Sequence, residues 1–276
     1  MDIRSDVITL AGCGNMGLPM AHRLHLSGFK VLGYDIRPLS EFTQFAKNML
    51  SDPARIAGSK ILLSVVRSER QTLDLCFDVQ GVFRRDKYPQ TLVVSSTISP
   101  RFIKYLSTRL PKDVRLIDAP MSGAPVAAEQ GTLSFMIGGK KEVVDDLMPM
   151  FESLGEQIFY CGGIGAGMTL KVINNYVAAA SVVSVRRAFD IARQLNVEID
   201  QLREVMAASS GATWFGDRFD EIAWARQGYD PENTIGILEK DVLSALDAVA
   251  ELPQFENTPL DSTLLEAVRS LKPYEQ

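Results

Sequence analysis

Lys171 is the only charged side chain between Cys161 and Arg186, and it lies in an apolar stretch with helical character. Apolar surroundings disfavour the ammonium form of a lysine and can bring its pKa to about 7–8, where the amine can exchange a proton near neutral pH. Asn174 and Asn175 follow three and four residues later, so a helix would place all three side chains on one face. This spacing indicates a proton-transfer site. The alternative is a lysine that extends toward solvent at a domain junction, with asparagines that cap nearby backbone.

A glycine-rich segment lies near the start of the chain. An apolar strand is predicted over 7–11, followed by GCGNMG at 12–17 and then by a helix, which is the setting that a G-x-G-x-x-G motif requires. Its first glycine permits a tight turn, the second lets the backbone approach a pyrophosphate, and the third lets helix and strand pack closely. The helix N-terminus offers N–H groups to the phosphates. The predicted cofactor-binding residues here are Gly12, Gly14, Asn15, Met16 and Gly17.

Asp35 ends the second predicted strand, in the place expected for a ribose-binding carboxylate. A carboxylate there accepts hydrogen bonds from the ribose hydroxyls and repels a 2′-phosphate, which favours NAD over NADP. Arg37 argues the other way, because a guanidinium two residues later could pair with that phosphate. Its alternative role is that of a solvated loop residue before Pro38. NAD is therefore the predicted cofactor, and NADP is the alternative.

Composition excludes several classes of function. The 276 residues carry a formal charge of −5 without a basic block, which argues against nucleic acid or an anionic membrane as a partner. Cys13, Cys76 and Cys161 have neither paired nor metal-ligand spacing, and His22 and His25 stand on one helix face, so no metal site is predicted. Reduced thiols and an N-terminus unlike a signal peptide predict a cytoplasmic protein.

The chain changes character near residue 163. Before it, short apolar strands alternate with amphipathic helices, which predicts an α/β domain over 1–163 with a Rossmann-type, doubly wound, mostly parallel sheet. After it, only helices are predicted, so 164–276 is expected to be an all-α domain for substrate binding and oligomerisation, joined by one long helix. The expected helices cover 166–195, 198–208, 213–226 and 235–251, with a short one after a proline-containing loop at 253–260. Residues 164–185 are long enough to suggest a membrane span, but their lysine, asparagines and neighbouring glycines favour a buried helix.

Four motifs together resemble those of the β-hydroxyacid dehydrogenase family, which includes 3-hydroxyisobutyrate and tartronate semialdehyde enzymes and is part of the 6-phosphogluconate dehydrogenase superfamily. They are GCGNMGLPMA (12–21), DAPMSGAPVAAEQGTL (118–133), GIGAGMTLKVINN (163–175) and the pair Lys240-Asp241. A weaker match is SSTISP (95–100). These motifs span nearly the whole chain in the family's order. The resemblance implies an oxidoreductase that transfers a hydride between NAD(P) and a small 3-hydroxy acid.

The resemblance also implies residue roles. Lys171 would be the general acid/base and Asn175 would position its amine or the substrate hydroxyl, with Asn174 beside the substrate. Ser122 and Gly123 would hold the substrate carboxylate, with Ser122 also counted among the catalytic residues. Ala124 would line the same pocket in place of the family's usual second glycine. Thr97 would face the nicotinamide or the substrate, and Lys240 would lie near the cofactor.

Departures from the family narrow the reaction. The phosphogluconate dehydrogenases carry a histidine and a glutamate where this chain has Asn174 and Ala178. The acid that would protonate the enol after a decarboxylation is therefore missing, which favours simple hydride transfer. An imine or ketone reductase would replace Lys171, and a non-catalytic dinucleotide-binding regulator would also lose it; both stay as alternatives. The apolar helix over 166–195 is longer than one domain easily covers, which predicts an assembly of several copies. The resemblance implies that this assembly is a homodimer or homotetramer.

Overall fold

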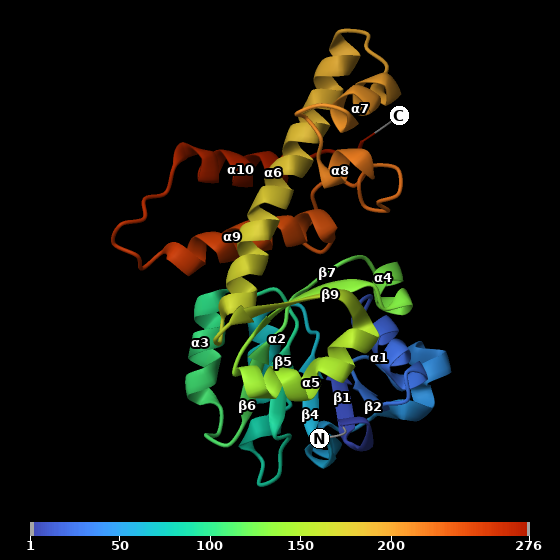
Figure 1. The fold of residues 1–276 in the computed structure, drawn as a ribbon, viewed down its shortest axis with the longest axis vertical. Helices are drawn as coiled ribbons and strands as arrows, with labels where there is room; N and C mark the ends of the chain where they lie inside the picture. Colours follow the sequence, from blue (N-terminus) through green and yellow to red (C-terminus); the bar gives the residue numbers. More distant parts are fainter. Residues whose placement is uncertain (1–2, 275–276) are drawn as a thin grey trace. The chain divides into compact units, whose positions relative to one another are not determined.

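The computed structural model describes residues 3–274, and the chain divides into two compact units, Met1–Lys171 and Val172–Gln276 (Figure 1). The boundary expected after residue 163 lies eight residues before this division. The roles assigned to the two domains from the sequence stay predictions.

The first unit is built on a sheet in the order β3-β2-β1-β4-β5-β6-β8-β7, with β9 paired to β8. Its first six strands are all parallel. They are β1 (Val7–Ala11), β2 (Lys30–Tyr34), β3 (Met49–Leu50), β4 (Ile61–Ser64), β5 (Thr91–Val94) and β6 (Arg115–Asp118). The direction reverses at β8 (Leu133–Gly138), which runs antiparallel to β6 and to β7 (Met121–Ser122), while β9 (Gly155–Gly162) is parallel to β8.

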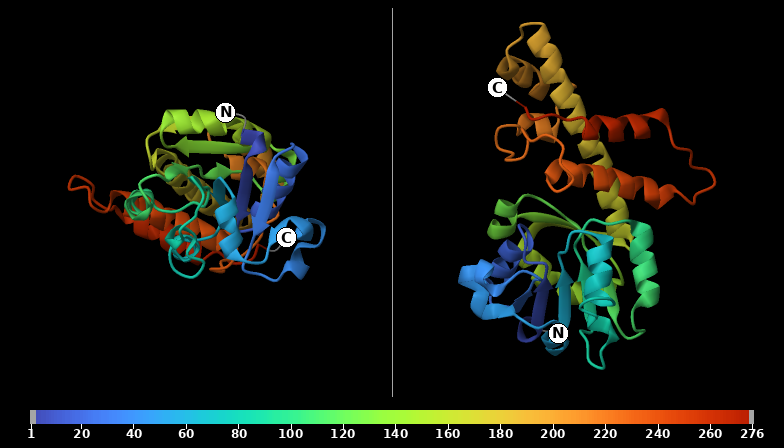
Figure 2. Two further views of the ribbon diagram at one scale, coloured as in Figure 1. Left: turned by 90° about the horizontal axis from the view of Figure 1, so that it is seen from below. Right: turned by 180° about the vertical axis from the view of Figure 1, so that it is seen from behind.

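Helices cover both faces of this sheet (Figures 1 and 2). They are α1 (Gly17–Leu26), α2 (Glu69–Cys76), α3 (Pro100–Arg109), α4 (Pro125–Gln130) and α5 (Lys141–Leu154). Four 3-10 segments complete the unit: Ile3–Ser5, Leu39–Asn48, Pro53–Gly58 and Val82–Arg84. Neighbouring strand residues belong to opposite apolar cores, as Leu62 and Leu63 show, because successive side chains point to opposite faces. A sheet buried on both faces explains why its strands read as continuous apolar runs. The predicted Rossmann-type fold is confirmed.

The described part of the second unit contains helices joined by turns and loops, and no strand. Helix α6 (Ala166–Gln194) starts in the first unit and continues into the second, where α7 (Ile199–Ala207), α8 (Trp214–Asp217), α9 (Thr234–Val249) and α10 (Pro259–Arg269) follow. Their core gathers aromatic rings, with Phe189 and Phe215 both packed edge-on against Phe219. The helical character predicted for this part of the chain is confirmed.

One helix prediction was wrong in extent. The helix expected over 213–226 is limited to Trp214–Asp217, and turns follow it. Single turn bonds such as Ala225 N–H to Ile222 C=O replace a helical ladder there. The apolar residues that suggested helical periodicity pack individually into the aromatic core of the unit. Phe215 stacks on Trp224, and Phe219 packs against Tyr274.

Candidate active site

The three glycines after β1 each meet a different geometric demand. Gly12 has φ +93°, and a β-carbon there would lie 2.7 Å from the Val65 carbonyl oxygen. A β-carbon at Gly14 would meet nothing within 4 Å, so the backbone faces open space at that position. A β-carbon at Gly17 would overlap the carbonyl oxygen of Gly12, which shows how closely α1 approaches the turn. These are the demands that a dinucleotide-binding turn makes on its backbone.

A cavity of about 990 Å³ opens beside this turn, at the carboxyl ends of β1, β2 and β4. Ligands bind at this edge in open α/β sheets. Its lining includes Gly12, Gly14, Asp35, Arg37, Val65 and Gln71. Of the other predicted loop residues, Asn15 is exposed and Met16 is half-buried against the core beneath the loop. The open space at Gly14 and the carboxylate at the end of β2 fit the adenosine half of NAD(P).

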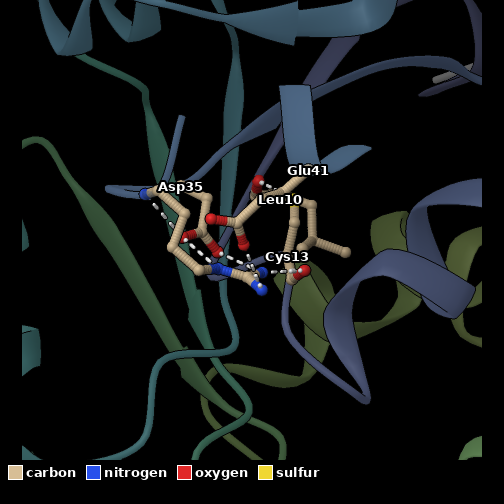
Figure 3. Close-up of polar contacts among 5 residues, drawn as sticks. Leu10, Cys13, Asp35 and Glu41 are labelled. Atoms are coloured by element: carbon tan, nitrogen blue, oxygen red, sulfur yellow. Dashed lines mark hydrogen bonds and ion pairs between the residues drawn. The ribbon is translucent and has the colours of Figure 1, made fainter. Parts of the chain in front are cut away.

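The Asp35 carboxylate is bound to Arg37 (Figure 3). The Arg37 Nε–H donates to Asp35 Oδ1 at 3.1 Å, and an Nη2–H donates to the Cys13 carbonyl oxygen at 2.8 Å. Glu41 lies 3.4 Å from Nη1, and the guanidinium carbon sits 4.9 Å from the centre of the Phe42 ring. The hydrogen bond to Asp35 raises the pKa of Arg37. A ribose that binds at Asp35 must therefore share this carboxylate with Arg37 or displace it.

Burial keeps the loop thiol in its protonated form, which is a poor nucleophile. Cys13 is 1% exposed, and burial, followed by the charge of Asp35, raises the pKa of its thiol to about 12. Its functional group is the main-chain carbonyl that accepts from Arg37, a role that no sequence pattern identifies. The histidines do not form a site either: the rings of His22 and His25 pack against Phe45. Within residues 3–274, no group of three or more His, Cys, Asp or Glu side chains could hold a metal ion.

The candidate carboxylate-binding segment follows β6. Ser122 is half-buried at the end of β7, opposite Ser134, and Gly123 has φ +136°. A β-carbon at Gly123 would lie 2.8 Å from a methyl group of Leu133, so this position requires glycine. Ala124 has φ −90° and ψ 171°, an extended conformation that alanine adopts freely. The alanine therefore fits this turn without backbone strain. Thr97, after β5, is half-buried.

Lys171 is 6% exposed and lies in the second turn of α6. The first turn of this helix is held by Asp118, the last residue of β6. The Asp118 carboxylate accepts from the backbone N–H groups of Gly165 and Met168, each at 2.8 Å. The first unit thus contains Lys171, the segment after β6 and the dinucleotide cavity.

The second unit holds the predicted asparagines and Lys240 in one network around Asp241. The Asn175 Nδ2–H donates to Asp241 Oδ2 at 2.5 Å, and Lys240 Nζ donates to Asp241 Oδ1 at 2.7 Å. Asn174 Nδ2 donates to Asn175 Oδ1 at 3.1 Å. Because a carboxylate only accepts, the bond to Asp241 fixes which end of the Asn175 amide carries the NH₂ group. Asn175 Oδ1 is therefore its acceptor end. Asp241, which the sequence placed in a motif without a role, is 2% exposed.

Helix α6 is long and apolar enough to cross a membrane by length and composition alone, a test that core helices of soluble proteins also pass. One of its charged side chains binds backbone partners in the second unit. Arg186 is 5% exposed and donates to the carbonyl oxygens of Ala225 and Gln227 at 2.9 and 3.1 Å, and to that of Lys272. These contacts tie the later part of α6 to other segments of the helical unit.

Comparisons with known proteins agree with this arrangement. The NAD binding domain of 6-phosphogluconate dehydrogenase matches residues 7–163, and the NAD-binding domain of NADP-dependent 3-hydroxyisobutyrate dehydrogenase matches residues 165–270. The fold and these matches define an NAD(P)-binding oxidoreductase. The chain belongs to the 3-hydroxyisobutyrate dehydrogenase-like family of hydroxyacid dehydrogenases.

The relatives extend over most of the chain. A 3-hydroxyisobutyrate dehydrogenase of Pseudomonas aeruginosa is 30% identical, over 92% of this chain and 88% of that protein. An NAD-dependent L-serine dehydrogenase of the same species is 29% identical, over 96% of this chain and 91% of that protein. The solved structure of Mycobacterium tuberculosis 3-hydroxyisobutyrate dehydrogenase with L-serine has a TM-score of 0.79 at 24% identity, and the alignment covers 97% of this chain and 96% of that one. This last likeness shows the fold.

Proposed function

We propose that the protein oxidises the 3-hydroxyl group of a small 3-hydroxy acid to the semialdehyde, with NAD as the preferred acceptor and Lys171 as the general base. The observation that carries this proposal is a buried lysine one helical turn before an asparagine whose amide a buried carboxylate holds. The named activities of the relatives suggest two substrate types, 3-hydroxyisobutyrate and L-serine. Both are small acids with a hydroxyl group on the β-carbon.

The reaction divides into a hydride transfer and a proton transfer. The nicotinamide, when bound, supplies the acceptor for the hydride that leaves the hydroxyl-bearing carbon. The proton of the hydroxyl passes to the neutral amine of Lys171, so that the products are the aldehyde, the reduced cofactor and the lysine ammonium. In the reverse direction the ammonium returns the proton. A buried amine suits this role because apolar surroundings favour its neutral form.

The remaining polar groups bind and orient. The Asn175 Oδ1 acceptor lies on the face of α6 that carries Lys171, one turn further along, where an amide oxygen can hold an amine or a hydroxyl in line. Ser122, Gly123 and Ala124 would cradle the substrate carboxylate, with Asn174 beside it. Thr97 would face the nicotinamide. Lys240 would meet the cofactor, with its amine set by Asp241.

Cofactor preference rests on Asp35 and Arg37. The Asp35 side chain is only 9% exposed and offers its carboxylate oxygens at the end of β2, as a ribose with free hydroxyls requires. Arg37 is 44% exposed and already pairs with this carboxylate. We propose that NAD binds at Asp35 and that NADP is used less well, because its 2′-phosphate would have to draw Arg37 away from Asp35.

The cell compartment and the assembly are also proposals. All three cysteines are free thiols, as a cytoplasmic protein would have them. In the helical unit, Ile173, Val177, Leu243 and Leu260 are 55%, 64%, 44% and 60% exposed. A second copy of the chain would cover such apolar side chains, so we propose a homodimer or homotetramer, which light scattering on the purified protein would test.

The test of function follows absorbance at 340 nm with 3-hydroxyisobutyrate, L-serine and other small 3-hydroxy acids, each with NAD and with NADP. Lys171→Ala should abolish turnover. Lys141→Ala is the matched control, because Lys141 is exposed, pairs with Asp145 along α5 and lies over the Tyr160 ring, away from the proposed site residues. Turnover that survives in Lys171→Ala would remove this lysine from the mechanism. A wild-type protein that binds NADH but turns over no compound would favour a regulator.

A further inference from the structure

Asp118 is a buried carboxylate that joins two segments of the first unit. It is 0% exposed, and its Oδ1 accepts from Gly165 N–H while its Oδ2 accepts from Met168 N–H. Gly165 precedes the first residue of α6, and Met168 is the third residue of that helix. Asp118 thus caps α6 from a strand 47 residues earlier.

Glycines around the Asp118 carboxylate leave the space that it occupies. A β-carbon at Gly138 would overlap Asp118 Oδ1, and a β-carbon at Gly167 would lie 3.0 Å from Oδ2. Gly138 is the residue opposite Asp118 across the β6–β8 pairing. Glycines on two separate elements therefore leave the space that the carboxylate fills. A longer acid would not fit the same cradle.

Two opposing effects act on the pKa of the Asp118 carboxyl. Burial raises the pKa of Asp118, and hydrogen bonds from the backbone of Gly165, Met168 and Gly167 oppose this rise. A helix N-terminus also carries unpaired N–H groups and a partial positive charge that favour an anion. The Asp118 carboxylate thus caps α6 as a local side chain usually would, although Asp118 lies far from α6 in the sequence.

Asp118 is connected to two segments of the candidate site, the one after β6 and the start of α6. Ser122 and Gly123 lie four and five residues after Asp118, beyond the end of β6. Lys171 lies three residues after Met168, nearly one turn along α6. Since Asp118 is covalently part of the first segment and hydrogen-bonded to the second, its position sets where the two begin relative to each other.

We propose that Asp118 is a positioning residue that sets the Lys171 amine against the carboxylate-binding segment after β6. This inference rests on the proposed function. A displacement of about 1 Å in a catalytic group can lower a rate by about 10²-fold even when the mutated residue does not touch the substrate. The loss should appear in kcat, because the dinucleotide cavity lies along β1, β2 and β4 and does not include this anchor.

The test compares wild type with Asp118→Asn, in which an NH₂ group would oppose one of the two backbone donors. We expect kcat to fall about 10²-fold with the best substrate, while the KM for NAD changes by less than about threefold. Hydrogen exchange of the amides in 165–171 should quicken by about tenfold or more, with β1 unchanged. Ile61→Val, a core change in β4, is the stability control and should show neither effect.

A second variant covers the case in which Asp118→Asn does not fold. Gly138→Ala would displace the carboxylate and leave its charge, and it should give the same loss of kcat. A kcat within about threefold of wild type in a variant whose 165–171 amides exchange faster would overturn the proposal, since Asp118 would then only stabilise α6. Unchanged exchange would overturn it as well. If the wild type oxidises no compound, the proposed function fails instead, and the exchange measurement still decides whether Asp118 anchors α6.

Discussion

Asp241 binds Asn175 and Lys240 with its two carboxylate oxygens, at 2.5 and 2.7 Å. Asn175 lies on α6 and the other two residues lie on α9, so the contact joins the two helices that carry the predicted polar groups of the helical unit. The bond turns the Asn175 amide so that its oxygen is the acceptor. Asp241, which has no proposed contact with the substrate, thus sets which atom of Asn175 can accept a hydrogen bond.

Asp241→Asn should therefore impair the reaction more than the fold. The new amide can donate as well as accept, so the orientation of Asn175 is no longer fixed. We expect kcat to fall by about tenfold to a hundredfold, and NADH affinity to fall by a smaller factor because Asp241 also sets the Lys240 amine. Stopped-flow absorbance and fluorescence titration would separate the two effects. Asp247→Asn, at a half-buried position later in α9, is the matched control. An equal loss in both variants would show a general effect on the helix.

Cofactor choice should respond to Asp35 and Arg37 in opposite directions. Asp35→Ser removes a charged acceptor of the ribose hydroxyls, an interaction of about 1.5–3 kcal/mol, so kcat/KM with NAD should fall by about tenfold or more. Arg37→Ala removes the guanidinium from the carboxylate and keeps only the backbone bond of residue 37, so use of NADP should fall while use of NAD is kept. The ratio of kcat/KM values for the two cofactors reports both changes. Better use of NADP in Arg37→Ala would contradict the role given to Arg37.

The Tyr176–Asp261 contact should make the stability of the helical unit depend on pH. Tyr176 donates to Asp261 Oδ1 at 2.6 Å, and Asp261 also caps α10 by accepting from Thr258 N–H at 2.7 Å. The Tyr176 bond, followed by that of Thr258, lowers the pKa of Asp261. A lowered folded-state pKa gives stability that is present above the unfolded value, about 3.9, and that is lost as pH falls through the folded value.

Asp261→Asn should accordingly destabilise at neutral pH and lose less stability in acid. The missing cap should cost about 0.5–2 kcal/mol at pH 7. The difference between wild type and variant should shrink as the pH falls below about 4. Urea unfolding followed by circular dichroism at pH 7, 4 and 3 measures it. A difference that stays constant over this range would mean that the carboxylate does not titrate with folding. Asp200→Asn, at an exposed position in α7, is the control.

At alkaline pH the dependence runs in the opposite direction, because stability is lost as the pH rises. Burial, followed by the bond to Asp261, raises the pKa of Tyr176 to about 12. A raised folded-state pKa gives stability that is complete below the unfolded value, about 10, and that is lost as pH rises toward 12. Tyr176→Phe should remove this alkaline loss. Unfolding measured at pH 9, 10 and 11 would show it, and an unaltered alkaline slope in the variant would count against the coupling.

Local patterns predicted most of the elements, and long-range contacts account for what they missed. A short stretch of sequence is enough to predict the glycine turn, β2 with Asp35, and α6, from residue spacing or apolar runs. The anchors do not: Asp118 binds residues 47 and 50 positions away, and Asn175 binds one 66 positions away. Strands β3 and β7, of two residues each, are too short for any periodicity. The reversal of direction at β8 is likewise set by pairing and not by composition.

Arg186 and its neighbour Arg187 provide the sharpest test of the packing of the helical unit. Arg186 is 5% exposed and donates to three backbone carbonyls that close the segments around 225–227 and 272, whereas Arg187 is exposed. A lysine cannot reproduce the planar fork of donors, so Arg186→Lys would leave buried carbonyls unpaired, at about 1–3 kcal/mol each. We expect Arg186→Lys to lower the free energy of unfolding by about 3 kcal/mol and Arg187→Lys to change it by less than about 0.5 kcal/mol. Chemical denaturation of both variants measures the contrast, and equal stabilities would mean that the carbonyl contacts of Arg186 contribute nothing to the fold.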